Sequence, residues 1–211
     1  MRQASSALLG MFLIALPATA QDMKQQWDWC ANRDNTYGPD LMIGGCTAII
    51  QAGRDTPENI AKAFSNRGHA YGAKAQYDRE IQDYDEAIRL DPSFAMAFYN
   101  RGTAYSNKGQ DDRAMEDFDQ AIRLDPKHGP AFNNRGLLYD TKGDYDRAIR
   151  DFDQAILLNP NYAIAFRNRG LVHLDKGQYD LAIRDFDQLL RLDPNDAEAK
   201  EERRKAQEKK R

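Results

Sequence analysis

The sequence predicts an all-α protein whose helix pairs stack in tandem into a solenoid. The tripeptide Asn-Arg-Gly recurs every 34 residues, beginning at Asn66, Asn100, Asn134 and Asn168. Each period carries two blocks of apolar residues at helical spacing, and glycine or proline separates the blocks. One helix pair cannot bury its apolar face alone, so neighbouring pairs must stack to form a core.

Length and composition fit one folded domain and give little indication of a nucleic-acid partner. The chain has 211 residues and a formal net charge of −3. Nucleic-acid binding usually requires a basic surface, which this balance does not provide. Apolar residues make up 41% of the chain and charged residues 30%. The regular placement of the apolar residues, more than their number, therefore predicts folding.

Residues 1–20 have the layout of a secretory signal peptide. Arg2 supplies a positive charge, an apolar run covers residues 7–17, and small residues occupy 18–20. The alternative is a transmembrane anchor, which needs about 20 apolar residues and so exceeds this run. No cysteine lies at the cleavage point, which argues against a lipoprotein. We expect cleavage after Ala20, a periplasmic or secreted protein, and no stable membrane insertion afterwards.

Residues 21–60 predict a divergent helix pair. A short first helix is expected over residues 25–32, and a second over residues 39–52, with Pro39 in its first turn and Gly53 as its stop. Aligning Ala48-Ile49 with Ala87-Ile88 makes the second of these a degenerate second helix of a repeat. Thr56-Pro57-Glu58 then provides a cap, a first-turn proline and a first-turn acid for the next helix.

The two cysteines of the chain, Cys30 and Cys46, lie in this N-terminal pair. An even count in an exported chain favours a disulfide, and closing the intervening 15 residues contributes roughly 3 kcal/mol. The alternative is two buried free thiols. A zinc site is not expected, because no histidine lies nearby.

Four repeats follow, at residues 61–94, 95–128, 129–162 and 163–196. In the second repeat, Phe98, Gly102 and Tyr105 mark the first helix, and Ala114, Phe118, Ala121 and Ile122 mark the second. Gly109 ends the first helix, where positive φ is needed, and Pro126 prevents the second from continuing. We expect Gly102 to face Ala114 and Ala121, and the aromatic rings to fill the space between neighbouring pairs.

The period, the small residues, the aromatic columns and Pro126 together resemble the tetratricopeptide repeat. The resemblance covers Ala61 to Asp196 and implies a right-handed α-solenoid that binds proteins or peptides. Glu80, His173 and Leu189 depart from the family pattern. The order of Cys30 and the segment Gly45-Cys46-Thr47-Ala48-Ile49-Ile50 ahead of such repeats also resembles exported repeat proteins of Gram-negative bacteria.

Residues 197–211 predict a polar C-terminal capping helix that frays toward Lys209, Lys210 and Arg211. This tail contains four acidic and seven basic residues. A solvated cap is one interpretation. The other is a basic arm that meets an acidic partner or anionic lipid.

The resemblance implies that the first helix of each repeat lines a concave groove. Asparagine there can hold the backbone of an extended peptide, because an amide offers both donor and acceptor; the alternative is an amide satisfied within the helix or by water. Some family members clamp a peptide carboxylate with Lys, Arg and Asn, but Lys62 and Arg167 lie three repeats apart, so that ligand is not expected. The predicted groove contacts are Asn66, Asn100, Asn134, Asn168, Tyr99, Thr103, Asn133, Leu137 and Arg167.

A column of arginines repeats together with pairs of aspartates on the second helices. The arginines could clamp a carboxylate ligand. The simpler interpretation is a structural ion-pair ladder, with each arginine of a first helix meeting aspartate on a second helix. The residues are Arg67, Arg101, Arg135 and Arg169, with Asp83, Asp85, Asp117, Asp119, Asp151, Asp153, Asp185 and Asp187.

No catalytic motif, metal site or cofactor site is recognised. His69, His128 and His173 have no cysteine or acid at ligand spacing, and no phosphate-binding glycine loop appears. The first hypothesis is a periplasmic interaction scaffold that binds a protein or peptide in its groove. The second is a self-assembling spacer that dimerises through repeat edges or ends. A hydrolase that depends on His69 or an aspartate pair is the third.

Overall fold

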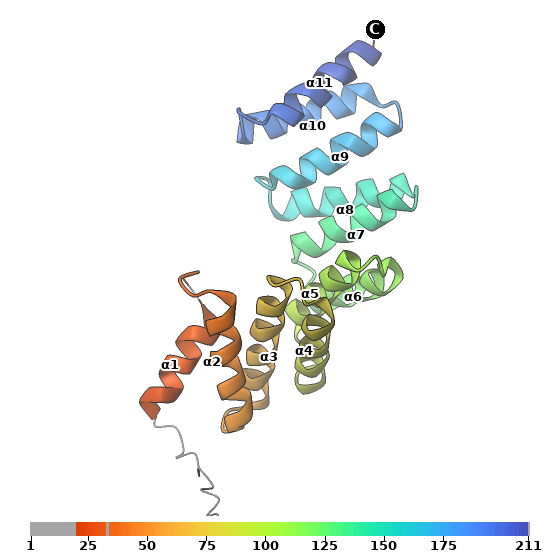
Figure 1. The fold of residues 1–211 in the computed structure, drawn as a ribbon. Helices are drawn as coiled ribbons and strands as arrows, with labels where there is room; N and C mark the ends of the chain where they lie inside the picture. Colours follow the sequence, from red (N-terminus) through yellow and green to blue (C-terminus); the bar gives the residue numbers. More distant parts are fainter. Residues whose placement is uncertain (1–19, 33, 211) are drawn as a thin grey trace, which may run out of the picture.

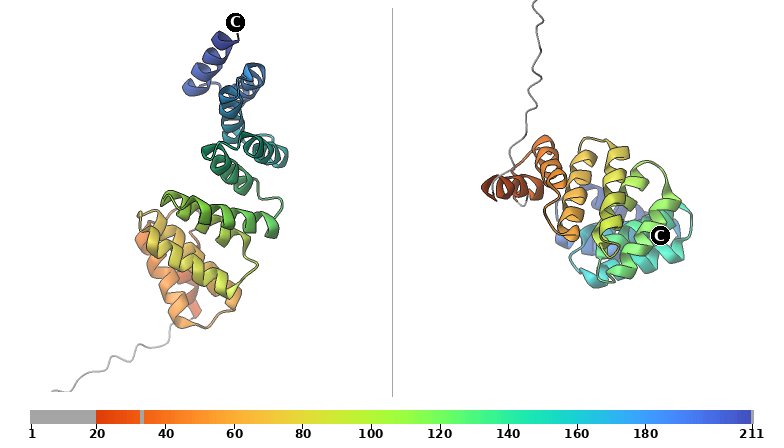
Figure 2. Two further views of the ribbon diagram at one scale, coloured as in Figure 1. Left: turned by 90° about the vertical axis from the view of Figure 1, so that its right-hand side faces the viewer. Right: turned by 90° about the horizontal axis from the view of Figure 1, so that it is seen from below.

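The computed structural model describes residues 20–32 and 34–210, and in that part of the chain all regular structure is α-helical. The predicted signal peptide lies outside the described residues, except for Ala20. Figures 1 and 2 show the helices following one another along a curved array, with α1 at one end and α11 at the other. The helices are α1 (Ala20–Ala31), α2 (Pro39–Ala52), α3 (Pro57–Gly72), α4 (Tyr77–Leu90), α5 (Ala95–Asn107), α6 (Asp111–Leu124), α7 (Gly129–Thr141), α8 (Tyr145–Leu158), α9 (Ala163–Asp175), α10 (Tyr179–Leu192) and α11 (Ala197–Lys209).

The helices alternate between two layers. Each helix packs against the next one in sequence, and α3 also contacts α5, α7 contacts α9, and α9 contacts α11. Contacts between successive first helices place them on the inner, shorter side of the curve, with the second helices outside. The predicted α-solenoid is therefore confirmed.

Turns within the repeats follow the predicted backbone chemistry. Gly109, Gly143 and Gly177 have φ of 70°, 73° and 70°, values that glycine adopts without steric cost. Ala75 occupies the same position in the first repeat and has φ 55°. That conformation is unfavourable for a residue with a Cβ.

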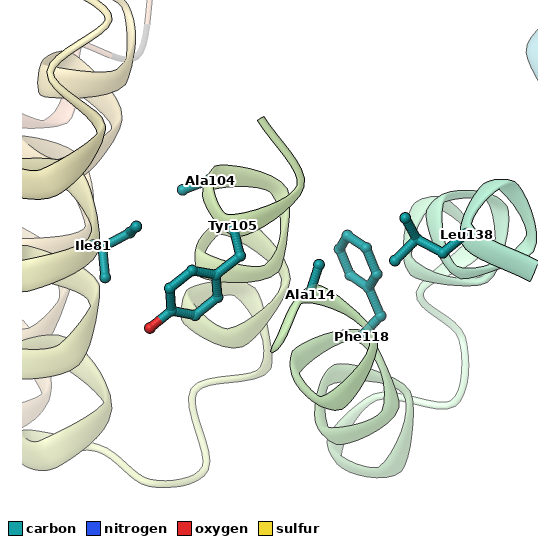
Figure 3. Packing of buried hydrophobic residues seen from close by; sticks show 6 residues of the cluster. All are labelled: Ile81, Ala104, Tyr105, Ala114, Phe118 and Leu138. Carbon is teal, nitrogen blue, oxygen red and sulfur yellow. The ribbon is translucent and has the colours of Figure 1, made fainter. Parts of the chain in front are cut away.

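Aromatic side chains join neighbouring pairs, as predicted. Tyr105 of α5 reaches toward Ile81 of α4, while Phe118 of α6 lies next to Leu138 of α7 (Figure 3). Phe118 is 1% exposed. Such rings remove large apolar areas from water at each junction, which makes the stacking of pairs the main source of stability.

The predicted neighbour of Gly102 was wrong. A Cβ at this position would lie 2.9 Å from the Phe118 ring and 3.1 Å from Cβ of Asp117. Ala114 and Ala121 are not its nearest contacts. Gly136 and Gly170 meet Phe152 and Phe186 in the same way. The glycine is therefore needed because the aromatic ring of the second helix lies directly on the first-helix backbone.

The N-terminal pair differs from the repeats in register. Cys30 and Cys46 form the predicted disulfide, with both residues fully buried. Helix α1 starts earlier than the expected residue 25, and α2 matches the predicted bounds. Ile49 is buried, whereas Ala48 is only partly buried. Ile49 therefore corresponds to the buried Ala87. The alignment of Ala48 with Ala87 proposed from the sequence was wrong by one residue.

In the fourth repeat two departures occur together. Arginine lies over a tyrosine ring in the first three repeats, with Arg113 3.9 Å from the Tyr105 centroid. The corresponding residues in the fourth are Leu181 and His173. His173 is buried, and its Nδ1 lies 2.7 Å from Oε1 of Gln178. In the fourth repeat, histidine in place of the tyrosine therefore occurs together with leucine in place of the arginine that stacks on the ring.

Helix α11 has the register of a first helix. Ala199 and Ala206 are buried like their counterparts Ala165 and Val172, 34 residues earlier. Arg203 forms an ion pair with Asp187, and Lys210 forms one with Asp180. The helix extends to Lys209, so it ends within the segment toward which fraying was predicted, and Arg211 lies outside the described residues.

Candidate partner-binding groove

The inner face of each first helix presents a stripe of incompletely buried residues. On α5, Met96, Asn100, Thr103 and Asn107 recur at helical spacing and stay at least partly exposed. Ala97, Ala104 and Tyr105 of the same helix are buried. The stripe therefore lies on the side of the helix that faces away from the core, which leaves it available to a partner.

A hydrogen-bonded chain of amides crosses three first helices. Nδ2 of Asn168 donates to Oδ1 of Asn133 over 2.9 Å, and Nδ2 of Asn133 donates to Oδ1 of Asn134 over 3.2 Å. Nδ2 of Asn134 then donates to Oη of Tyr99 over 3.4 Å. The chain joins α9, α7 and α5, and it holds Asn134 and Asn168 in defined orientations.

Asn133 departs from its predicted role as a direct contact. Its side chain is only 2% exposed, and both ends of its amide are engaged by the neighbouring asparagines. It therefore braces the groove from below. The sequence could not reveal this, because position 133 carries a different residue in each repeat.

The remaining two asparagines are less constrained. Nδ2 of Asn66 has only a long 4.0 Å contact with Sγ of Cys30. Asn66 lines a pocket of about 440 Å³ with Trp27 and Lys62. Within the described part of the chain, the Asn100 side chain has no hydrogen-bond partner. Asn100 is therefore the amide most available to an incoming backbone.

Tyr99, Thr103 and Leu137 surround these amides. Tyr99 packs on His128 with ring centroids 4.6 Å apart, and Oγ1 of Thr103 donates to the carbonyl oxygen of Tyr99 over 3.0 Å. Leu137 is 37% exposed. The centre of the groove thus combines fixed amides with an open apolar side chain.

Arg167 was predicted to contact a partner in the groove, but its side chain is paired with acidic residues at the start of α11. Its Nη2 pairs with Asp196, and its Nη1 lies 3.0 Å from Oε2 of Glu198. Arg167 lines a pocket of about 420 Å³ between α9 and α11. It joins the last repeat to the capping helix and is not a free cation in the groove.

The arginine column forms the predicted ion-pair ladder. Arg135 binds Asp151 through Nε and Nη2, both at 2.7 Å, and Asp119 of the preceding repeat through Nη1, also at 2.7 Å. Arg101 and Arg169 repeat this arrangement. A guanidinium forked onto a carboxylate is a strong, oriented interaction. These arginines are therefore committed to joining helices.

Arg67, the first arginine of the column, differs from the others in one of its partners. Arg67 binds Asp83 with the same fork, but its Nη1 lies 3.1 Å from Oγ1 of Thr47 in α2. The hydrogen bond to Asp83 raises the pKa of Arg67. The ladder therefore reaches the N-terminal pair through a neutral hydroxyl.

A second ladder was missed by the sequence analysis. A lysine after each first helix pairs with an aspartate near the start of the preceding second helix, as in Lys142 with Asp112 at 2.5 Å. The lysines recur every 34 residues and could have been noticed, but their partners lie one repeat away. The pairs are Lys74–Asp40, Lys108–Asp78, Lys142–Asp112, Lys176–Asp146 and Lys210–Asp180.

The C-terminal bases are mostly engaged in ion pairs. Arg203 binds Asp187, Arg204 binds Glu201 and Glu208, Lys205 binds Glu202, and Lys210 binds Asp180. Four of the described basic side chains of the tail therefore have an acidic neighbour within the protein.

Glu80 is a buried acid away from the groove. It is 8% exposed, and its Oε2 has no hydrogen-bond partner. Its carboxyl group occupies the space beside Gly72, where a Cβ would lie 2.5 Å from Oε1. Burial raises the pKa of Glu80 to about 7, against the opposing effect of a hydrogen bond with Tyr84. An acid therefore fits at position 80, where a small residue is expected, because Gly72 opposite it has no side chain.

No helix among the described residues has the length and apolar character required to cross a membrane. The same part of the chain contains no group of three or more His, Cys, Asp or Glu residues placed to hold a metal ion.

Comparison with known proteins identifies the repeats. Family models described as tetratricopeptide repeat match residues 95–128 and 133–199, and one described as TPR repeat matches residues 68–109. Together these matches span more than half of the chain. No curated protein sequence matches it significantly.

Solved structures with the same fold include a tetratricopeptide repeat protein from Parabacteroides merdae. It is 20% identical, with a TM-score of 0.73, over 90% of this chain and 73% of that one. YrrB, titled a TPR protein with an unusual peptide-binding site, is 19% identical, with a TM-score of 0.66, over 86% of this chain and 91% of its own. The first TPR of Spaghetti (RPAP3), bound to an HSP90 peptide, is 27% identical, with a TM-score of 0.53, over 54% and 90%. Because tetratricopeptide repeat models match more than half of its residues, this chain belongs to the tetratricopeptide repeat family.

Proposed function

We propose that this protein is a periplasmic or secreted interaction scaffold that holds an extended segment of a protein partner against the inner faces of α5, α7 and α9. The observation that carries the proposal is the separation of tasks among the repeated columns. Arginine, lysine and aspartate join helices, whereas Asn100, Leu137 and their neighbours are left facing outward on the inner layer.

The chemistry of this face suits an extended peptide. Asn134 and Asn168 are held by the amide chain, so little side-chain entropy is lost when they bind a partner. An amide can donate to a backbone carbonyl and accept from a backbone N–H, independent of the partner's sequence. Exposed Met96, Leu137 and Ile164 supply apolar contacts that select among sequences.

The alternative, a spacer that assembles through its ends, is less well supported at the C-terminus. Lys200, Arg204 and Gln207 of α11 stand where earlier first helices have phenylalanine, glycine and tyrosine or histidine. Those three columns form the contact with a second helix. A charged side chain at the glycine position does not allow a second helix to pack on α11 as closely as it does within the repeats.

A pull-down from periplasmic extract tests the binding proposal. Asn100→Ala removes an amide that has no partner within the described chain, so it should leave the fold unchanged and reduce recovery of specific partners. Gln82→Ala, on the exposed outer face of α4, is the matched control. Equal recovery by wild type and both variants would exclude Asn100 from the binding site.

The proposed export of the protein to the periplasm or medium is tested separately. Fractionation of cells that express the full chain should place the protein in the periplasm or medium, with Gln21 as the N-terminal residue by mass spectrometry. A protein that retains residues 1–20 inside the cell would contradict export.

A further inference from the structure

The groove ends in a pocket of unusual composition. This pocket has a volume of about 420 Å³ and lies between α9 and α11. Leu171, which is 36% exposed, and Ala197 supply apolar surface, and Glu198, Glu201 and Glu202 supply carboxylates. An apolar wall beside acidic groups suits a side chain with an aliphatic stem and a cationic head.

The acids coincide with the groove columns of the repeat. Glu202 continues the asparagine column after Asn168, Glu201 follows Arg167, and Glu198 follows Ile164, each by 34 residues. Over the same helix the buried alanines and the ladder arginine are retained, at Ala199, Ala206 and Arg203. A cap needs only polar residues, so three carboxylates on the inner-face columns exceed what capping requires.

Two of these carboxylates, on Glu201 and Glu202, can be recruited by a partner. Glu201 pairs with Arg204 and Glu202 with Lys205, both at 2.7 Å and within one turn of the same helix. Exposed pairs of this kind contribute little to stability. A cation that enters the partly enclosed pocket is less screened and can compete with them.

Arg167, which lines the pocket, also has an unused donor. Nε of Arg167 is buried and has no hydrogen-bond acceptor in the described chain, although its Nη atoms are paired. A buried donor without an acceptor is costly. A shift of the Arg167 side chain that opens Nε to the pocket would let the carbonyl oxygen of a bound peptide supply one.

We infer that this pocket binds a lysine or arginine side chain of the partner, flanked by apolar residues, and so fixes the position of the partner at the C-terminal end of the groove. The inference rests on the proposed function and adds the chemical class of the segment that is recognised. Its aliphatic stem packs on Leu171, its head lies among Glu198, Glu201 and Glu202, and its backbone carbonyl accepts from Arg167.

NMR titration with three blocked tripeptides tests the inference. The probes are acetyl-Leu-Lys-Leu-amide and its analogues with Gln or Glu in the centre. The Lys peptide should shift backbone resonances of α11 and of Leu171 saturably, with a dissociation constant of about 1 mM. The Gln peptide should bind about tenfold more weakly, the Glu peptide should not bind, and added salt should weaken the Lys peptide.

Variants locate the effect. Glu198→Gln, Glu201→Gln and Glu202→Gln together should abolish the response to the Lys peptide. Glu208→Gln, which removes an exposed pair with Arg204 on the same helix, should leave it unchanged. Equal binding of the Lys and Gln peptides, shifts that map elsewhere, or no shift at millimolar concentration would overturn the inference. A negative result in this titration would not affect the pull-down of a partner that depends on Asn100. The proposed function is therefore judged separately.

Discussion

Ala75 occupies a turn position that the other three repeats give to glycine. Its φ of 55° is unfavourable for alanine. Ala75→Gly should raise the free energy of unfolding by roughly 0.5–1 kcal/mol, because relief of the strain exceeds the greater unfolded-state entropy of glycine. Urea denaturation measures this. Gly109→Ala, with φ 70°, is the reverse control and should lower stability; a loss of stability in both variants would show that Ala75 is not strained.

Glu80 makes stability depend on pH in the direction opposite to that of a paired acid. Its pKa rises from 4.5 in the unfolded chain to about 7 in the fold, so the folded state binds more protons between these values. The contribution of Glu80 to the free energy of unfolding is therefore fully present below pH 4.5. It is lost as pH rises through about 7, by up to roughly 3 kcal/mol.

The isosteric variant isolates this effect from the other carboxylates. Glu80→Gln cannot ionise, so its stability relative to wild type should increase as pH rises from 4.5 to 7. Urea denaturation of both proteins across that range provides the comparison. A difference independent of pH would show that Glu80 titrates as an ordinary surface acid.

At the scale of the helices, Arg135 connects α7 to both α6 and α8. Arg135→Leu would leave Asp151, which is 5% exposed, as a buried unpaired carboxylate, at a cost of about 3–5 kcal/mol. We expect a large fall in melting temperature, with little change in partner affinity for the molecules that remain folded. An unchanged melting temperature accompanied by lost binding would assign Arg135 to the groove.

Helix boundaries were predictable where the sequence contains local stop signals. Pro39 and Gly53 bracket α2, and its predicted bounds are correct. The start of α1 carries no such signal, and the helix begins before the predicted residue. The partner of Gly102 was misassigned for a different reason: the repeat shows which residues share a column, but not which column of the second helix lies closest.

Across the whole molecule, the disulfide acts at the end where the repeat is least regular. Cys30 and Cys46 join α1 to α2, and Ile49 packs with them. Reduction should remove roughly 3 kcal/mol from the N-terminal pair. Because solenoids are stabilised by nearest neighbours, the effect should decline along the array. Hydrogen exchange should therefore rise in α1 and α2 and stay constant in α8 and α10; a uniform rise would contradict a local role.

The site was less predictable than the fold. The sequence located the asparagine column, but it could not show that Asn133 lies beneath Asn134 and Asn168, since these contacts cross from one repeat to the next. The lysine ladder was missed for the same reason. Arg167 was assigned to the groove because its acidic partners, Asp196 and Glu198, lie at the end of the last repeat and just beyond it.

The most direct test of the account is site-specific photocrosslinking of the partner in the native compartment. A benzophenone side chain would replace Thr103 or Leu137 on the inner face, and Gln82 or Gln154 on the outer face. If the first helices carry recognition while the charged columns brace the solenoid, adducts with one partner should form from Thr103 and Leu137 and not from the outer positions. Adducts from Gln82 and Gln154 alone would contradict it.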